Sequence, residues 1–168
     1  MENKERLRKI IWRIAVVIFA IVIIFLAFYN IKDLKQAKRA EYTLRQLKEL
    51  RIALEEYYQL ANEYPNLTQE GAKDNLRILD YTDKNGKFIS FAEIYGRDSL
   101  PSTPENENIG ESNMIYDTDN FSKGSRTGGW NYDFSGRTGE IHANLPVNIL
   151  SQNVDWCEYE LRILEVKK

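Results

Sequence analysis

Oxygen-bearing side chains gather in one polar stretch in the second half of the sequence. Asp117, Asp119 and Asn120 lie within four positions of one another. Carboxylate and carboxamide oxygens are ligands that Ca²⁺ prefers, which makes these three residues candidate metal ligands. The stretch lacks the Asp-x-Asp-x-Asp-Gly pattern of the common calcium loop, so we favour a solvated acidic loop and expect no bound metal. The residues Glu105, Glu107 and Asn108 precede it in the sequence.

The other groups capable of chemistry are few, because the chain has one histidine and one cysteine. These numbers exclude an internal disulfide and the common zinc clusters. Strand alternation predicts that His142 faces water, and Cys157 is interpreted as a small buried thiol. Neither a nucleophile elbow nor a phosphate-binding loop is present. We therefore expect a non-catalytic protein without a cofactor.

The 168 residues carry a net charge of −2, and this charge is unevenly distributed. Residues 1–31 have a net charge of +3, whereas the remaining 137 have −5. An acidic main part excludes a general nucleic-acid binder, because phosphate binding needs a basic face.

Residues 10–31 are predicted to form a transmembrane helix, preceded by a basic cytoplasmic segment, residues 1–9. Positions 14–31 contain no charge, and the apolar region is long enough to cross a hydrocarbon core of about 30 Å. A cleaved signal peptide and a buried soluble helix are the weaker alternatives. The basic start and the large domain that follows favour a cytoplasmic N-terminus. The residues expected to anchor the helix in lipid are Trp12, Ile14, Val17, Ile18, Ile21, Phe25 and Tyr29.

Residues 32–64 are predicted to continue the same helix, because no Pro occurs before Pro65 and no Gly before Gly71. Apolar residues recur every three or four positions from Leu34 to Ala61, which predicts one apolar stripe. We expect the stripe to pack on a soluble domain, and a coiled-coil dimer is the rival interpretation. Two charged pairs, Arg45–Glu49 and Arg51–Glu55, are predicted on the opposite side.

Residues 65–168 are predicted to form an extracytoplasmic loop and a small antiparallel sheet, one domain with residues 32–64. A turn at 83–86 precedes a strand at 87–91, and residues 97–113 are typical of a long surface loop. A hairpin joins 130–134 to 140–143, and the last strands fall at 147–150 and 158–166, the latter with a helix as alternative. The fold class is α+β, with helix–sheet packing by Leu44, Leu47, Leu54, Tyr57, Trp130 and Tyr132.

Three stretches together resemble bacterial type IV pilins and type II secretion pseudopilins. The first is 27–65, where an apolar helix end is followed by basic residues, a Leu/Ala stripe, Ala-Leu-x-x-Tyr and Tyr-Pro. The second contains Ile-Tyr-Gly at 94–96 and Leu-Pro at 100–101. The third is Gly-Gly-Trp-Asn-Tyr at 128–132 followed by Gly-Glu-Ile at 139–141. The resemblance implies a long helix packed on a sheet, and partners that are other pilin-like subunits or secretion components.

The start of the chain departs from the family pattern of a Gly followed by Phe-Thr-Leu-Ile-Glu. Here the sequence from 6 to 13 is Arg-Leu-Arg-Lys-Ile-Ile-Trp-Arg, and Trp12 stands roughly where the family has its glutamate. We therefore expect an unprocessed accessory or minor component of a type IV pilus or type II secretion-like system. The alternative is a single-pass extracytoplasmic binding or sensor domain that has a pilin-like fold and does not enter filaments.

Overall fold

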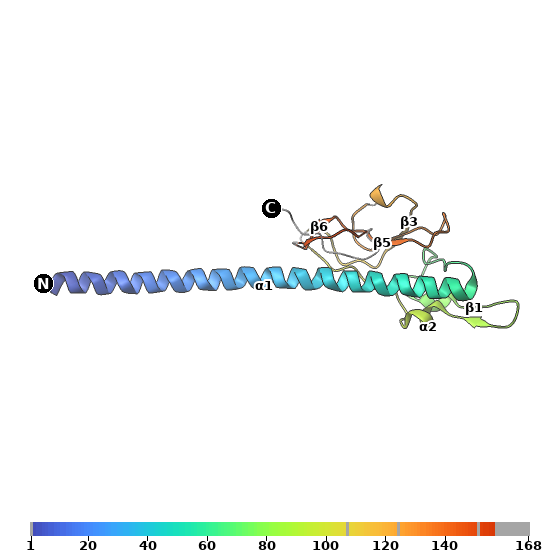
Figure 1. Cartoon of the computed structure of the whole chain (residues 1–168), viewed down its shortest axis with the longest axis horizontal. Coiled ribbons are helices and arrows are strands. Elements are labelled where there is room, and N and C mark those ends of the chain that lie inside the picture. The colour runs from blue at the N-terminus through green and yellow to red at the C-terminus, as the bar shows by residue number, and fades with distance from the viewer. Residues whose placement is uncertain (1, 107, 124, 151, 157–168) are drawn as a thin grey trace.

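The computed structural model describes residues 2–106, 108–123, 125–150 and 152–156. One helix, α1 (Glu2–Ala61), forms an axis about 90 Å long, and the other elements lie along its C-terminal part (Figure 1). The sheet containing β5 lies on one side of this helix, and α2 with β1 lies on the other. The fold is α+β, with one long N-terminal helix and small sheets.

Helix α1 ends at Ala61. The next residue, Asn62, adopts a left-handed backbone conformation with φ of 58°. The Asn62 N–H still donates to the carbonyl oxygen of Tyr58 at 2.8 Å, which satisfies an otherwise orphaned carbonyl of the last turn. The chain then turns back at Pro65, which cannot continue a helix.

The helix begins to be covered at Gln36, the first residue with a half-buried side chain. Leu34, which the sequence pattern includes in the apolar stripe, is 57% exposed, so the buried part of the stripe starts further along the helix. The buried residues of α1 are Ala40, Thr43, Gln46, Leu47, Leu50, Ala53, Leu54 and Tyr57, and Leu44 packs against them from a half-buried position.

On one side of α1 lie η1 (Leu76–Leu79), β1 (Tyr81–Thr82), β2 (Phe88–Ile89) and α2 (Phe91–Tyr95). The predicted turn at 83–86 joins β1 to β2 as an antiparallel hairpin, with the Asp83 carboxylate accepting the N–H groups of Asn85 and Lys87, each at 2.8 Å. Strand β2 is shorter than predicted, because the Ser90 side chain caps a helix that starts at Phe91.

On the other side, β3 (Ile115–Asp117), β4 (Trp130–Tyr132) and β5 (Ile141–Ala143) form a sheet in that order. The β4–β5 hairpin is antiparallel, with Tyr132 opposite Ile141. Strand β3, however, runs parallel to β4, so the expectation of a wholly antiparallel sheet was wrong. The connection between them, which contains η2 (Phe121–Lys123), is long enough for the crossover that a parallel pair requires.

A separate two-stranded pair, β6 (Asn148–Ile149) and β7 (Gln152–Asn153), follows the main sheet. Strand β6 falls within the predicted strand at 147–150. The predicted strand at 158–166 and Cys157 lie outside the described residues.

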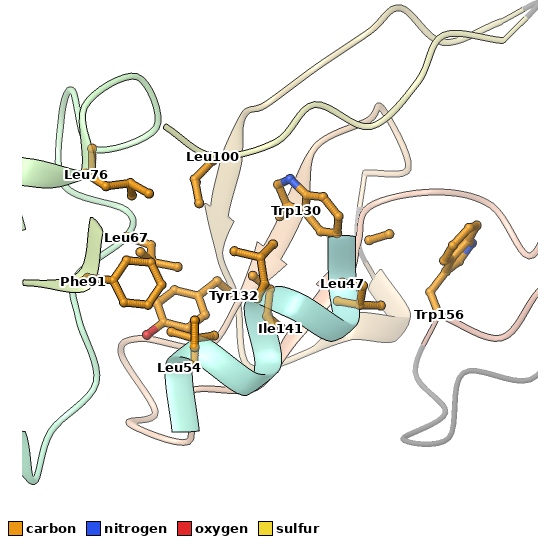
Figure 2. Packing of buried hydrophobic residues seen from close by; sticks show 14 of the residues in the cluster. Leu47, Leu54, Leu67, Leu76, Phe91, Leu100, Trp130, Tyr132, Ile141 and Trp156 are labelled. Atoms are coloured by element: carbon orange, nitrogen blue, oxygen red, sulfur yellow. The ribbon is translucent and has the colours of Figure 1, made fainter. Parts of the chain in front are cut away.

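The core forms where α1 meets the sheet (Figure 2). Trp130 and Tyr132 have no exposed surface, and Figure 2 shows them beside Leu47, Leu54 and Ile141. Both polar atoms of these aromatic residues are satisfied. The Trp130 Nε1–H donates to the Pro101 carbonyl oxygen at 2.7 Å, and the Tyr132 hydroxyl donates to the Pro65 carbonyl oxygen at 2.9 Å.

The stretch 97–113, expected on the surface, is partly interior. Leu100 is 3% exposed and Thr103 is fully buried, and Thr103 pairs with Ser112 through a β-bridge. The sequence predicted a surface loop because most residues of this stretch are polar. The buried positions are too few and too irregularly spaced to form a recognisable pattern.

Candidate functional site

The most unusual surface of the molecule is the N-terminal half of α1. Every side chain described from Lys4 to Lys35 is exposed, on all sides of the helix. Within the described residues, α1 is the one helix long and apolar enough to cross a membrane, and none of its apolar window is buried. Because its surface is uncovered, this stretch is not the core helix of the described domain. The exposed anchor positions are Trp12, Ile14, Val17, Ile18, Ile21, Phe25 and Tyr29.

The ends of the apolar stretch carry aromatic and basic side chains. Trp12 is 71% exposed and Tyr29 is 68% exposed, and about 25 Å of helix separates them. That distance is close to the thickness of a bilayer's hydrocarbon core, at whose edges Trp and Tyr are enriched. The basic residues on either side are Lys4, Arg6, Arg8, Lys9 and Arg13, and then Lys32, Lys35, Lys38 and Arg39.

The folded domain contacts the last residue of this basic flank. Arg39 donates from Nη1 to the backbone carbonyl oxygen of Glu105 at 3.0 Å, and its Nη2 lies 3.3 Å from the Glu105 carboxylate. This contact ties α1 to a loop 66 positions away in the sequence. The apolar stretch and the domain are therefore joined by a helix that is uninterrupted and braced where it leaves the apolar part.

The calcium candidates do not form a ligand set. The Asp117 carboxylate accepts the backbone N–H groups of Phe134 and Ser135 at 3.1 Å each, and also the Ser135 hydroxyl. Burial acts to raise the pKa of Asp117, but these hydrogen bonds outweigh it and hold the pKa below its ordinary value. Asp119 is exposed, and the Asn120 carboxamide oxygen accepts from Ser122 at 2.7 Å. Among the described residues, no group of three His, Cys, Asp or Glu side chains could hold a metal ion.

His142 is buried, with 3% of its surface exposed, so the prediction of a water-facing histidine was wrong. Its ring stacks on Phe121 of η2, with 3.9 Å between ring centroids, and its Nε2 lies 2.7 Å from a Glu140 carboxylate oxygen. Phe121 of η2 therefore covers His142 on the second face of the sheet, a contact that period-two alternation cannot reveal. Burial lowers the pKa of His142, against an opposing effect from the hydrogen bond to Glu140.

Arg51 has a role that sequence reasoning missed. Its guanidinium donates to the backbone carbonyl oxygens of Ile141 and Trp156, whereas the sequence predicted only a surface pair with Glu55. The Glu55 carboxylate accepts from Gln59 at 2.8 Å, and the other predicted pair, Arg45–Glu49, has an N–O distance of 4.0 Å. No local pattern signals the Arg51 contacts, because both partners are backbone atoms about a hundred positions away.

Concave surfaces flank α1 at both ends of the domain. An open groove of about 1550 Å³ lies between the helix and the β4–β5 turn, and its walls include Leu44, Ile52 and Gly139. Ile52 is 57% exposed on this groove. A smaller cleft of about 310 Å³ lies at the other end of the domain, where Tyr29 and Lys32 of α1 face Asn148 of β6.

The fold and the exposed apolar helix define a class: an α+β domain carried on a helix that is able to span a membrane once. Comparison with known proteins finds no matching family model, no matching curated protein and no matching solved structure.

Proposed function

We propose that this protein is a non-catalytic, membrane-anchored, pilin-like protein that acts by packing against other subunits. The observation that carries the proposal is the continuity of α1, whose uncharged stretch 14–31 is exposed and whose second half buries one stripe of side chains against the domain. Such a helix places one half in lipid and holds the domain rigidly above it. The succession of motifs at 27–65 and 128–141 supports a pilin-like identity.

The proposed location is the bacterial inner membrane, crossed once, with residues 1–9 in the cytoplasm and the domain outside. Burial of the apolar stretch in lipid removes a large hydrophobic surface from water. Orientation can be tested by adding protease to spheroplasts. With the proposed orientation, the protease should cleave the domain and leave an N-terminal tag protected. Cleavage of the tag with protection of the domain would reverse the proposed orientation.

The proposed role is that of an accessory or minor component in a type IV pilus or a type II secretion-like system. The start of the sequence supports an accessory role, because it lacks the Gly and the Glu on which the family's processing and assembly depend. Mass spectrometry of the protein from native membranes should then find residues 1–13 retained. A mature chain starting near Ile10 with a methylated amine would contradict this role, and a chain starting beyond the apolar stretch would remove the anchor itself.

The groove beside Ile52 is the surface we assign to partner docking, because Ile52 is an apolar side chain that is 57% exposed on an open groove. The full-length protein, cross-linked in its native membranes and then solubilised, should capture proteins that carry the prepilin start motif. Ile52→Glu should abolish the capture, and Ile52→Leu, which keeps the apolar surface, should preserve it. Capture that is equal in both variants would show that the groove is not the docking surface.

The alternative function is a single-pass binding or sensor domain that does not enter filaments, and the missing processing motif fits it as well as it fits an accessory subunit. It predicts that no protein with a prepilin start is captured by the wild-type chain. A chain that stays soluble without detergent would contradict both functions.

A further inference from the structure

The small cleft at the N-terminal end of the domain lies at the level where lipid headgroups would surround α1. Its walls come from three separate segments: the helix turn from Tyr29 to Gln36, the loop containing Asn106 and Asn108, and the chain around β6. Figure 1 shows β6 at the end of the domain that is nearer the N-terminal half of α1.

The depth of this cleft follows from helix geometry. The uncharged stretch ends at Ile31, and a headgroup layer is about 5–7 Å thick on each side of a bilayer. From Lys32 to Gln36 the helix rises about 6 Å. If α1 crosses the membrane as proposed above, the cleft therefore opens within the headgroup layer, with Tyr29 at its lipid side.

The cleft has both polar and apolar walls. Lys32 supplies an ammonium group, and Gln36, Asn106, Asn108 and Asn148 contribute carboxamides, which donate to phosphate oxygens and accept from hydroxyl groups. The Asp33 carboxylate also lines the cleft, where it can only accept, as from the hydroxyl groups of a glycerol headgroup. The volume of about 310 Å³ is at the small end of the range for ligand sites.

The charge around the cleft favours an anionic headgroup over a zwitterionic one. The helix segment 32–39 contains Lys32, Lys35, Lys38 and Arg39 against a single acidic residue, Asp33. Lys35 and Lys38 are exposed, and basic residues near a membrane surface attract anionic lipid. Arg39 is paired with Glu105, which offsets its charge, so the positive charge of this helix surface comes from the lysines.

We propose that the cleft between the Tyr29–Gln36 turn of α1 and the β6 segment binds the phosphodiester headgroup of an anionic phospholipid such as phosphatidylglycerol. The site rests on the proposed membrane anchor and adds a specific lipid contact that fixes the domain against the bilayer. A headgroup held by both α1 and the β6 segment opposes tilting of the domain away from the membrane.

The test uses the full-length protein in nanodiscs of phosphatidylcholine mixed with phosphatidylglycerol, followed by native mass spectrometry of the lipids that it retains. Wild-type protein should retain phosphatidylglycerol in preference to phosphatidylcholine. Lys32→Ala should lower that retention about fivefold. Asn148→Leu, which changes no charge, should lower it as well without changing the thermal melt.

Lys38→Ala is the matched control, because Lys38 is a neighbouring exposed lysine outside the cleft. An equal loss in Lys32→Ala and Lys38→Ala, with none in Asn148→Leu, would show diffuse electrostatic attraction and overturn the site. Complete competition by inorganic phosphate would identify a free-anion site and overturn the lipid proposal. Failure of the protein to insert into nanodiscs would contradict the anchor, whereas insertion without lipid preference would contradict the cleft alone.

Discussion

The guanidinium of Arg51 on α1 donates two hydrogen bonds to the carbonyl oxygen of Ile141 on β5, from Nε at 3.1 Å and from Nη2 at 3.0 Å. The same Nη2 lies 3.2 Å from the carbonyl oxygen of Trp156. One helix side chain thus joins the edge of the sheet to the last described part of the chain. The long helix is therefore fixed to the sheet by directional bonds as well as by apolar contact.

Arg51→Met should destabilise the domain by about 2 kcal/mol, because it removes charge-assisted hydrogen bonds and leaves two carbonyl groups without this donor. Arg51→Lys should recover part of the loss, since an ammonium can reach one carbonyl at a time. Chemical unfolding of the full-length protein in detergent, followed by tryptophan fluorescence, measures the change. Arg45→Met is the control, because the Arg45 side chain is 66% exposed and its replacement should change the unfolding free energy little. An equal loss of unfolding free energy in Arg51→Met and Arg45→Met would contradict the structural role of Arg51.

Leu54→Asp should unfold the soluble domain, because Leu54 is 2% exposed and a lone carboxylate there would be buried without a partner. Ile52→Asp should leave the domain folded, since Ile52 lies two positions away on the same helix and is 57% exposed. Near-UV circular dichroism reports the packing of the core tryptophans while α1 itself stays helical in detergent. A normal thermal transition in Leu54→Asp would show that the buried stripe is not part of the core.

His142 should make stability depend on pH below neutrality. Its pKa in the folded protein is lowered by burial, so the unfolded chain binds the proton more readily. Its contribution is therefore complete above the unfolded pKa of about 6.5 and is lost as the pH falls below that value toward the folded pKa. The charged groups that act on it are Glu140 and Asp155, which favour the protonated form, and Arg51, which opposes it.

His142→Gln should remove this pH dependence, and the difference from the wild type should appear between about pH 7 and pH 5. Glu140→Gln should steepen it, because it removes a group that stabilises the protonated ring. Loss of stability below about pH 4 should remain in both variants, since Asp74, Asp83 and Asp117 have lowered pKa values. Identical unfolding profiles for wild type and His142→Gln across this range would contradict the prediction.

Gly139→Ala should be strongly destabilising, because a Cβ there would collide with the ring of Tyr64. Gly86→Ala is the matched control for the steric cost. Both glycines have a positive φ, 81° at Gly86 and 68° at Gly139, but nothing lies within 4 Å of a Cβ at Gly86. Both variants carry the strain of a left-handed backbone, so their difference in unfolding free energy measures the collision alone. Equal stabilities would show that Tyr64 can move aside at little cost.

The elements with local causes could be predicted from the sequence. The long helix follows from unbroken helix-compatible residues up to Pro65, and the turn at 83–86 follows from its Asp and Gly. The burial of Leu47, Leu54 and Tyr57 has the spacing of a helical stripe. Each of these features depends on residues close together in the chain, where periodicity and backbone preference apply.

The features that the sequence did not reveal depend on distant contacts. The burial of His142 requires η2 to cover the second face of the sheet, and the parallel direction of β3 requires the course of the crossover. The cleft between Tyr29 and Asn148 likewise brings together positions more than a hundred residues apart. By itself, the sequence determined an apolar helix able to span a membrane and a stripe that needs a partner, because both are set by residue type and helical period. Only the tertiary structure decided what covers the stripe and which polar groups meet at the end of the domain, because chain folding sets those distances.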